Sequence, residues 1–439
     1  MNRFIYFILL ATMANPISAS PFELVSKTTN SKSLTFMAPN LDTIVKDGFT
    51  RLTTPEKGST TENGMPELPV FTSYFQMDAG ISYDVTYSIV SSHVIEDMEI
   101  YPYQGEPVIG VEKPFLKNMN FYNSNTNYPE IKLTVSEPMI MRDIEVGLIS
   151  LTPYDYNAIT KSLTVYDEVE INIVESGERE MTTSLPPKRS KIFEPFYEDL
   201  IVDYEPLSSR DEYQPAAIMY ICGGASSSHP YVEELVKWRR KQGYIVYLIS
   251  ESEAGTSANS IKSFLQNVLT DFDDPPEIVG LIGDTSGSYS IPHFTYSGGA
   301  TDVEYSSLSG NDFLPEIFIG RISVNSSSDI SNIINKTLTY EKAVHHGNWW
   351  FERAALVGDP TDSGVSTITT MKYIQNIMEN HGMNDIRTCY DCNSEDNWVE
   401  NQFDDGILYY NYRGFYGSSG IGQSGLNSGM YTPFAASLT

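Results

Sequence analysis

Two mostly apolar runs, separated by a long polar loop, place the strongest constraint on how this chain folds. The runs cover residues 278–282 (IVGLI) and 317–322 (IFIGRI). Neither run alternates between apolar and polar residues, which is typical of strands buried on both faces of a parallel sheet. Functional residues in such sheets gather on loops at the carboxyl ends of the strands. Asp284, two residues after the first run, is therefore a candidate site residue.

Strand-length apolar runs alternate with helix-like segments from residue 216 onward. The expected strands are 217–221, 244–249, 278–282, 317–322, 354–358, 385–390 and 406–412, and the expected helices are 230–242, 257–270, 328–345 and 366–379. This alternation predicts right-handed crossovers and a mostly parallel, three-layer α/β sheet of Rossmann-like type. Another strand begins near Pro433 with no helix after it before Thr439, so we expect the domain over 216–439 to be C-terminally truncated.

Residues 20–175 have a different pattern, in which short β-rich runs are separated by turn residues. Several runs alternate apolar and polar residues, which predicts half-buried antiparallel strands in an all-β domain. Residues 176–215 then read as a linker, with a local basic island at 186–189 (PPKR). Because proteases cut exposed linkers, activation cleavage after Arg189 is one hypothesis, and a simple domain spacer is the alternative.

The N-terminal segment and the charge balance indicate where the protein acts. Residues 1–19 combine a short basic start with a brief apolar run and a small-residue end, as secretory signals do. No later stretch is long and apolar enough for a membrane helix, so we expect a secreted or cell-surface protein. The 28 Lys and Arg residues against 57 Asp and Glu residues give a net charge of -29. This charge argues against nucleic-acid and anionic-membrane partners.

Three segments of the second half carry a resemblance to a known family. They are 282–284 (IGD), 299–302 (GATD) and 310–323 (GNDFLPEIFIGRIS), and in this order they resemble the gingipain family of secreted cysteine peptidases. The resemblance implies a caspase-like α/β fold and protein or peptide substrates. Residues 64–70 (GMPELPV) resemble the start of the family's propeptide, which implies a β-rich prodomain that keeps the peptidase inactive until it is cut.

The resemblance also assigns catalytic positions. Residues 411–414 (NYRG) match the approach to the family's histidine, but this chain has Phe415 at that position, and phenylalanine cannot transfer a proton. Asp359 falls where the family places an acid that orients the histidine, although a strand-end cap is an equal alternative. The nucleophilic cysteine is expected just beyond Thr439. We therefore expect the 439-residue chain to be inactive, with His293 as the best substitute base.

Metal and specificity residues follow from the same comparison. Asp284, Asp302, Asp312 and Glu316 surround one loop, and the family uses calcium structurally, so calcium is plausible at Asp302 and Asp284. No other cofactor is expected. The acidic specificity residue of Arg-directed family members corresponds to Thr367, which argues against predicting cleavage after Arg or Lys.

The cysteines and glycines leave alternatives open. Cys222, Cys389 and Cys392 are too few for a disulfide framework. The CxxC spacing of the last two favours incidental cysteines or a local disulfide over a redox centre.

A secreted cysteine-type endopeptidase precursor is the leading function. The alternative is a non-catalytic relative that binds surfaces or proteins, and a third reading is a carbohydrate- or nucleotide-binding protein, since Gly223-Gly224 follows a strand without completing a dinucleotide fingerprint.

Overall fold

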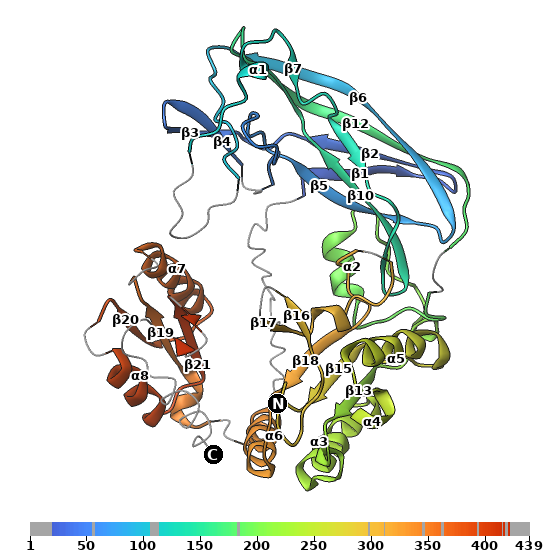
Figure 1. Cartoon of the computed structure of the whole chain (residues 1–439), viewed down its shortest axis with the longest axis vertical. Helices are drawn as coiled ribbons and strands as arrows, with labels where there is room; N and C mark the ends of the chain where they lie inside the picture. Colours follow the sequence, from blue (N-terminus) through green and yellow to red (C-terminus); the bar gives the residue numbers. More distant parts are fainter. Residues whose placement is uncertain are drawn as a thin grey trace, which may run out of the picture. The chain divides into compact units, whose positions relative to one another are not determined.

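The computed structural model of the chain describes residues 20–54, 58–105, 114–181, 185–296, 299–310, 312–344, 347–360, 364–392, 395–414, 416–417 and 420–421. Figure 1 shows the order of the helices and strands along the chain. The expected secretory signal at residues 1–19 lies outside the described residues, so it stays a prediction. No helix in the described part of the chain has the length and the apolar character that crossing a membrane requires.

A six-stranded antiparallel sheet forms the first layer of the β-rich N-terminal region. Its strands are β1 (Phe22–Lys27), β2 (Ser31–Met37), β6 (Ile81–Ile95), β7 (Asn127–Tyr128), β11 (Tyr154–Asn157) and β12 (Ser162–Glu178). The order is β1-β2-β12-β11-β7, and β6 pairs with β12. Burial alternates along β2, with Leu34 and Phe36 inside. This alternation is the period-2 pattern of a half-buried strand.

A second antiparallel sheet packs against the first. It contains β5 (Phe71–Met77), β8 (Leu133–Val135), β9 (Met139–Met141) and β10 (Ile144–Leu151). The rings of Phe36 in β2 and Phe71 in β5 have centroids 5.2 Å apart. Both belong to one buried cluster that also takes in side chains of β10 and β12. The N-terminal region is thus a β-sandwich, accompanied by the hairpin β3 (Asp42–Lys46) and β4 (Phe49–Thr53) and by the short helix α1 (Met119–Tyr122).

The segment expected to be a linker is instead partly helical and buried. Helix α2 (Glu194–Leu200) lies within it. Phe193, Tyr197 and Ile201 recur every fourth residue and are almost completely buried in a cluster with Met141 and Leu314. Apolar residues at this spacing form one face of a helix. Composition alone predicts a linker here, because prolines and basic residues precede α2 and composition takes no account of the spacing of apolar residues.

The predicted α/β region begins with a four-stranded sheet of order β14-β13-β15-β18. Its strands are β13 (Ala217–Cys222), β14 (Ile245–Ser250), β15 (Ile278–Ile282) and β18 (Phe318–Ile322). The Glu277 N–H donates to the Ala217 carbonyl at one end, and the Gly223 N–H donates to the Ile282 carbonyl at the other, so β13 and β15 run parallel. The accompanying elements are α3 (Pro230–Lys241), α4 (Glu251–Ala254), α5 (Ala258–Asp271), α6 (Ser327–Glu341) and the hairpin β16 (Phe294–Tyr296) and β17 (Gly299–Thr301).

A separate three-stranded sheet follows, of order β20-β19-β21. It consists of β19 (Arg353–Gly358), β20 (Asp385–Tyr390) and β21 (Tyr409–Arg413), all parallel. Val357 clusters with Val399 of α8 (Glu395–Asp404), whereas the next residue, Gly358, approaches Ile368 of α7 (Ser366–Asn380). The two helices therefore cover opposite faces of the sheet, as Figure 1 shows, and this part has three layers.

The single continuous sheet expected from the sequence is thus two sheets among the described residues. Strand–helix alternation predicts which segments are strands and that they run parallel, but it does not predict which strand lies beside which. Short strands β22 (Tyr416–Gly417) and β23 (Gly420–Ile421) pair after the second sheet.

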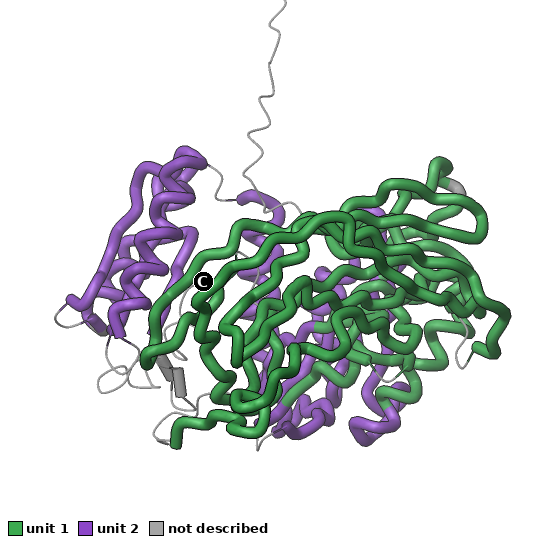
Figure 2. The backbone as a smooth tube through the Cα atoms, turned by 90° about the horizontal axis from the view of Figure 1, so that it is seen from above, with its two compact units in different colours: residues 1–217, 261–279, 301–319 green, residues 218–260, 280–300, 320–439 purple. Residues whose placement is uncertain are grey.

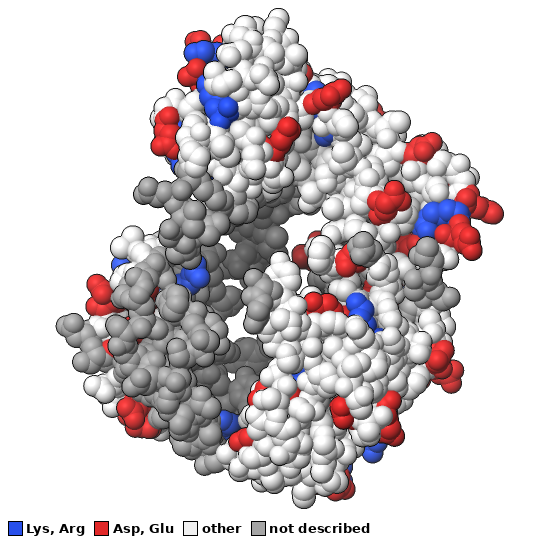
Figure 3. Space-filling view, viewed as in Figure 1, with Lys and Arg blue, Asp and Glu red and all other residues white. Residues whose placement is uncertain are grey.

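The chain divides into two compact units, coloured separately in Figure 2. Unit 1 joins residues 1–217 to 261–279 and 301–319, and unit 2 holds 218–260, 280–300 and 320–439. The segments that lead into β15 and β18 therefore belong to the same unit as the β-sandwich. Acidic side chains are scattered over the face seen in Figure 3 and are not gathered in one patch.

Candidate active site at the strand ends

The carboxyl ends of β19 and β21 meet at Asp359. These strands pair in parallel up to Gly358 and Arg413, so the residues that follow emerge at the same edge. The Asp359 N–H donates to the Arg413 carbonyl at 2.9 Å, and the Tyr412 hydroxyl donates to Asp359 Oδ2 at 3.1 Å. Asp359 is only 6% exposed. Its carboxylate is thus held beside the strand from which residue 415 leaves.

Gly414 allows this close approach. A Cβ added at Gly414 would lie 2.3 Å from the Tyr412 hydroxyl and 2.9 Å from Cβ of Asp359. Any larger residue would push the strand end away from the carboxylate. Phe415, at the position where the resemblance places a histidine, lies outside the described residues, so its prediction stays untested. Asp359 lies next to Arg413 and Gly414, the two residues that precede position 415, and its role as an orienting acid stays a prediction.

Neither His293, the predicted substitute base, nor Thr367, at the predicted specificity position, forms a hydrogen bond with the Asp359 carboxylate among the described residues. His293 is half-buried between β15 and β16, and among the described residues it makes no hydrogen bond or ion pair with Asp359. Thr367 is 1% exposed in the first turn of α7, where its hydroxyl donates to the Gly364 carbonyl at 3.0 Å. Thr367 is thus a buried residue whose hydroxyl caps the start of α7.

Asp284 lies at the end of β15, as expected, but protein groups already occupy its carboxylate. Oδ1 accepts from the Thr285 N–H at 2.7 Å, and Oδ2 accepts from Asn325 Nδ2 at 2.6 Å. Partial burial raises the Asp284 pKa, yet these hydrogen bonds, together with Ser323 and the charge of Arg321, outweigh it and hold the pKa below its ordinary value. Asp284 is therefore a carboxylate that ties β15 to the segment after β18.

The other acidic residues of this loop have separate partners. Asp302 precedes the short helix at Val303–Tyr305. Asp312 accepts from the Leu314 N–H at 2.8 Å, and Glu316 accepts from the Ser309 N–H at 3.0 Å. Within the described ranges, no three His, Cys, Asp or Glu residues form a group that could hold a metal ion. The calcium site at Asp302 and Asp284 therefore stays a prediction.

Glu316 has the most perturbed carboxyl group of this loop. It is 0% exposed, and burial raises its pKa to about 8 despite the hydrogen bonds from the Leu308 and Ser309 N–H groups. A carboxyl group in such surroundings favours its protonated form.

The space beside Gly223 and Gly224 is filled by protein. A Cβ on Gly223 would lie 2.2 Å from the Tyr289 carbonyl oxygen, and a Cβ on Gly224 would lie 2.3 Å from that of Ser288. A glycine loop that binds phosphate must leave its backbone N–H groups open to the ligand. In this arrangement the segment after β15 covers the loop, which argues against the nucleotide-binding alternative.

The proposed cleavage position after Arg189 is enclosed. Ser190 is 0% exposed; its N–H donates to Asp143 and its hydroxyl donates to Glu277. The Arg189 carbonyl accepts from the Gln214 N–H at 2.9 Å. A protease must bind an extended, accessible segment, so cleavage here requires prior local opening. Cleavage after Arg189 stays a prediction that this arrangement does not favour.

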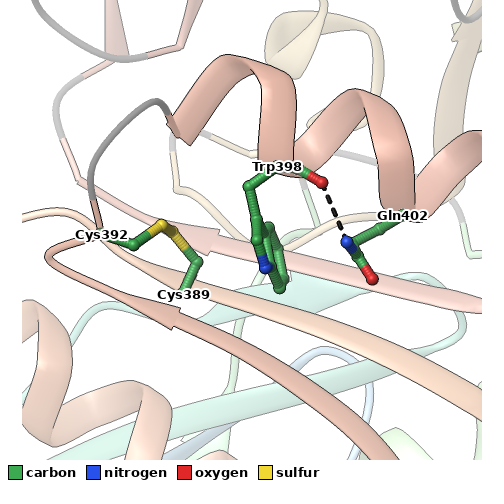
Figure 4. The surroundings of a disulfide bond; sticks show 4 residues. All are labelled: Cys389, Cys392, Trp398 and Gln402. Carbon is green, nitrogen blue, oxygen red and sulfur yellow. Dashed lines mark hydrogen bonds between the residues drawn. A yellow bond between two sulfur atoms is a disulfide. The ribbon is translucent and has the colours of Figure 1, made fainter.

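A disulfide joins Cys389 and Cys392 beside the candidate site. Cys389 is the second-last residue of β20 and pairs with Val357 of β19. The Asp391 N–H, between the two cysteines, donates to the Gly358 carbonyl at 3.2 Å. In Figure 4 the Trp398 ring lies next to the disulfide. The backbone carbonyl of Trp398 accepts a hydrogen bond from Gln402 Nε2 at 3.0 Å. Of the two sequence alternatives, the local disulfide is the one present, and it braces the loop adjoining Asp359.

A β-rich domain followed by parallel α/β sheets, with an acid at the strand ends, is the organisation expected of a cysteine peptidase preceded by its propeptide. Residues 26–210 match the C25 propeptide family, and residues 211–434 match Peptidase family C25. The chain belongs to this gingipain-type family of cysteine peptidases, which confirms the resemblance seen in the sequence.

Relatives with curated descriptions agree with this assignment. Gingipain R2 of Porphyromonas gingivalis is 26% identical over 383 residues, which cover 83% of this chain and 50% of the relative. Lys-gingipain of the same organism is 26% identical over 366 residues, covering 77% of this chain and 20% of the relative. The chain thus spans half the length or less of these relatives.

Two solved structures are among those found to be similar to this chain. The Arg-specific cysteine proteinase gingipain R has a TM-score of 0.44 at 24% identity and covers 52% of each chain. The complex of the pro- and mature domains of Porphyromonas gingivalis RgpB has a TM-score of 0.36 at 23% identity, covering 42% of this chain and 98% of the other.

Proposed function

We propose that this chain is part of a secreted precursor of a cysteine-type endopeptidase. The observation that carries the proposal is the meeting of Asp359 with Arg413 and Gly414, at the strand ends where the family assembles its acid and histidine. The same chain carries the family's propeptide over residues 26–210. Protein or peptide chains are the substrates implied by a peptidase family.

The proposed chemistry is acyl transfer through a thioester. A cysteine thiolate attacks the scissile carbonyl carbon, the amine leaves with a proton, and water then hydrolyses the thioester. An acid such as Asp359 would orient the base that moves these protons. The nucleophile of the proposal lies outside these 439 residues, and Phe415 occupies the family's histidine position. The 439-residue chain is therefore proposed to be inactive by itself, with His293 as the residue to test as a substitute base.

Export is supported by two independent features. Residues 1–19 have the pattern of a secretory signal. The Cys389–Cys392 disulfide is a bond that persists in oxidising compartments and is rare in the cytosol.

Activation is proposed to occur between the two family segments. The propeptide match ends at Arg210 and the peptidase match begins at Asp211. Arg210 is exposed, in contrast to the enclosed Arg189–Ser190 bond. A protease that cuts after arginine can thus reach the family boundary directly.

The second candidate is a non-catalytic member of the family that binds proteins or surfaces, and Phe415 is the observation that favours it. A thiol-directed activity probe separates the two candidates when it is applied to a protein that contains this chain and the segment following Thr439, after propeptide removal. Labelling that disappears when the first cysteine after Thr439 is changed to alanine supports the peptidase. An unlabelled protein, or labelling that survives this change, favours the binder.

A further inference from the structure

A completely buried arginine stands at the tip of the β9–β10 hairpin. Arg142 and Asp143 connect the two strands, and Met141 pairs with Ile144. Arg142 has φ +53° and is 0% exposed. Hairpin tips with positive φ normally carry glycine or asparagine, because a β-carbon is unfavourable there. An arginine in this conformation therefore indicates a role for its side chain.

Four acceptors converge on the Arg142 guanidinium. Nη1 donates to the carbonyls of Pro276 at 3.1 Å and Glu316 at 2.7 Å. Nη2 donates to the Pro275 carbonyl at 2.9 Å and to Gln214 Oε1 at 3.3 Å. We call Gln214, Pro275, Pro276 and Glu316 the arginine socket. Its three backbone carbonyls belong to the chain segments that lead into β15 and β18. They accept hydrogen bonds from both terminal nitrogens of the planar guanidinium, an arrangement that the single ammonium group of lysine cannot reproduce.

Acidic residues of both family segments surround the guanidinium. Asp143, Glu277 and Glu316 act on Arg142 electrostatically, although the hydrogen bonds are made by neutral acceptors. Ser190 links two of these acids, since its N–H donates to Asp143 at 2.6 Å and its hydroxyl donates to Glu277 at 2.7 Å. The aromatic ring of Phe193 also lies against the guanidinium, with its centroid 5.4 Å from Cζ of Arg142. The site is thus built for a buried cation.

All of these residues lie in compact unit 1, yet they belong to two family segments. Arg142 falls within the propeptide match, and the whole socket falls within the peptidase match. The socket precedes β15 and β18, whereas the proposed catalytic residues follow β19 and β21. It is therefore made of different residues from those of the candidate active site.

We propose that the peptidase segment carries an arginine-binding socket through which Arg142 retains the propeptide after the chain between them is cut. The inference rests on the propeptide role in the proposed function, but it concerns retention and not the blocking of catalysis. A guanidinium is the ligand class, and Arg142 of the same chain is the occupant.

The test uses the full chain with a site-specific protease sequence inserted between the exposed residues Ser208 and Ser209. After cutting, size-exclusion chromatography over a dilution series measures how tightly the two fragments stay together. The wild-type fragments are expected to co-elute. Arg142→Met should weaken their association by roughly 100-fold, because losing one partner of a buried charged network is costly. Arg142→Lys should fall between the two.

Arg179→Met is the matched control, since the Arg179 guanidinium pairs with Glu145 on its own side of the cut; its fragments should associate as the wild type does. If Arg142→Met fails to fold, Gln214→Leu tests the socket from the peptidase side and should also weaken association. Arginine methyl ester should release the wild-type propeptide faster than lysine methyl ester at equal ionic strength.

Wild-type fragments that separate at once, Arg142→Met or Gln214→Leu fragments that stay together as tightly as the wild type, or equal release by the two esters would each overturn the proposal. An absence of thiol-probe labelling would count against the proposed peptidase activity and would leave these association results unchanged.

Discussion

Tyr412 donates a hydrogen bond from its hydroxyl to Oδ2 of Asp359 across 3.1 Å, and this contact joins the ends of β21 and β19. Tyr412 also packs against the apolar cluster of Val357, Cys389 and Val399. The sequence predicts both strands and singles out Asp359 as a candidate acid. It does not predict that the tyrosine preceding Arg413 and Gly414 is the residue that fixes the carboxylate.

Replacing Tyr412 by phenylalanine should destabilise the C-terminal sheet while keeping its packing. The change removes one donor from a nearly buried carboxylate, which costs about 1–3 kcal/mol in the free energy of unfolding. Urea unfolding followed by fluorescence measures this loss. Tyr409→Phe is the control, because Tyr409 is 46% exposed on the same strand and its change should stay within about 0.5 kcal/mol. Equal stability of the two variants would contradict the structural role of the hydroxyl.

Limited trypsin digestion of the folded chain should cut after Arg210 before it cuts after Arg189. Arg210 is exposed at the start of a single helical turn, whereas the Arg189 bond leads into the fully buried Ser190. Mass spectrometry of early time points should find a fragment that begins at Asp211. A fragment beginning at Ser190 that appears first would show that the segment before α2 opens more readily than its hydrogen bonds suggest.

The sequence predicts individual elements well because their signals are local. The mostly apolar runs at 278–282 and 317–322 correspond to β15 and β18, and the alternating runs of the N-terminal half correspond to strands of the β-sandwich. Local signals fail where the answer depends on partners far along the chain. They do not reveal that β18 and β19 belong to different sheets. They also do not single out the four-residue spacing of Phe193, Tyr197 and Ile201, because the surrounding segment is polar.

The arginine socket illustrates the same limit at the level of a site. Arg142 is more than 130 positions from Pro275 and Pro276, and its acceptors are mostly backbone carbonyls, which every residue possesses. A sequence motif of side chains therefore cannot predict such a site. The one available signal is an arginine between two short apolar runs, at a position where a hairpin tip favours glycine or asparagine.

The three cysteines should react in a fixed order with an alkylating reagent. Cys222 is 0% exposed, and burial raises the pKa of its thiol to about 12, so it carries almost no thiolate at neutral pH. Cys389 and Cys392 are joined in a disulfide. Mass spectrometry should therefore find no adduct on the folded chain, an adduct at Cys222 alone after unfolding, and adducts at all three cysteines after unfolding with reductant. Labelling of Cys389 in the folded, unreduced chain would contradict the disulfide.

The stability of unit 1 should depend on pH through Glu316. Burial raises its pKa in the folded chain to about 8, above the ordinary value of 4.5 that applies after unfolding. The folded state therefore binds one more proton between these two values, so Glu316 contributes stability that is complete below pH 4.5 and is lost as the pH rises to 8. The slope for one proton is at most about 1.4 kcal/mol per pH unit.

Glu316→Gln isolates this contribution from the other buried acids of the unit. The amide is neutral like the protonated carboxyl group, and its oxygen can still accept from the Leu308 and Ser309 N–H groups. Unfolding free energies from pH 5 to 9 should fall more steeply for the wild type than for the variant, with the difference levelling off above pH 8. Glu304→Gln, on the same loop, is the control and should follow the wild-type curve. Parallel curves for the wild type and Glu316→Gln would mean that Glu316 is ionised throughout this range.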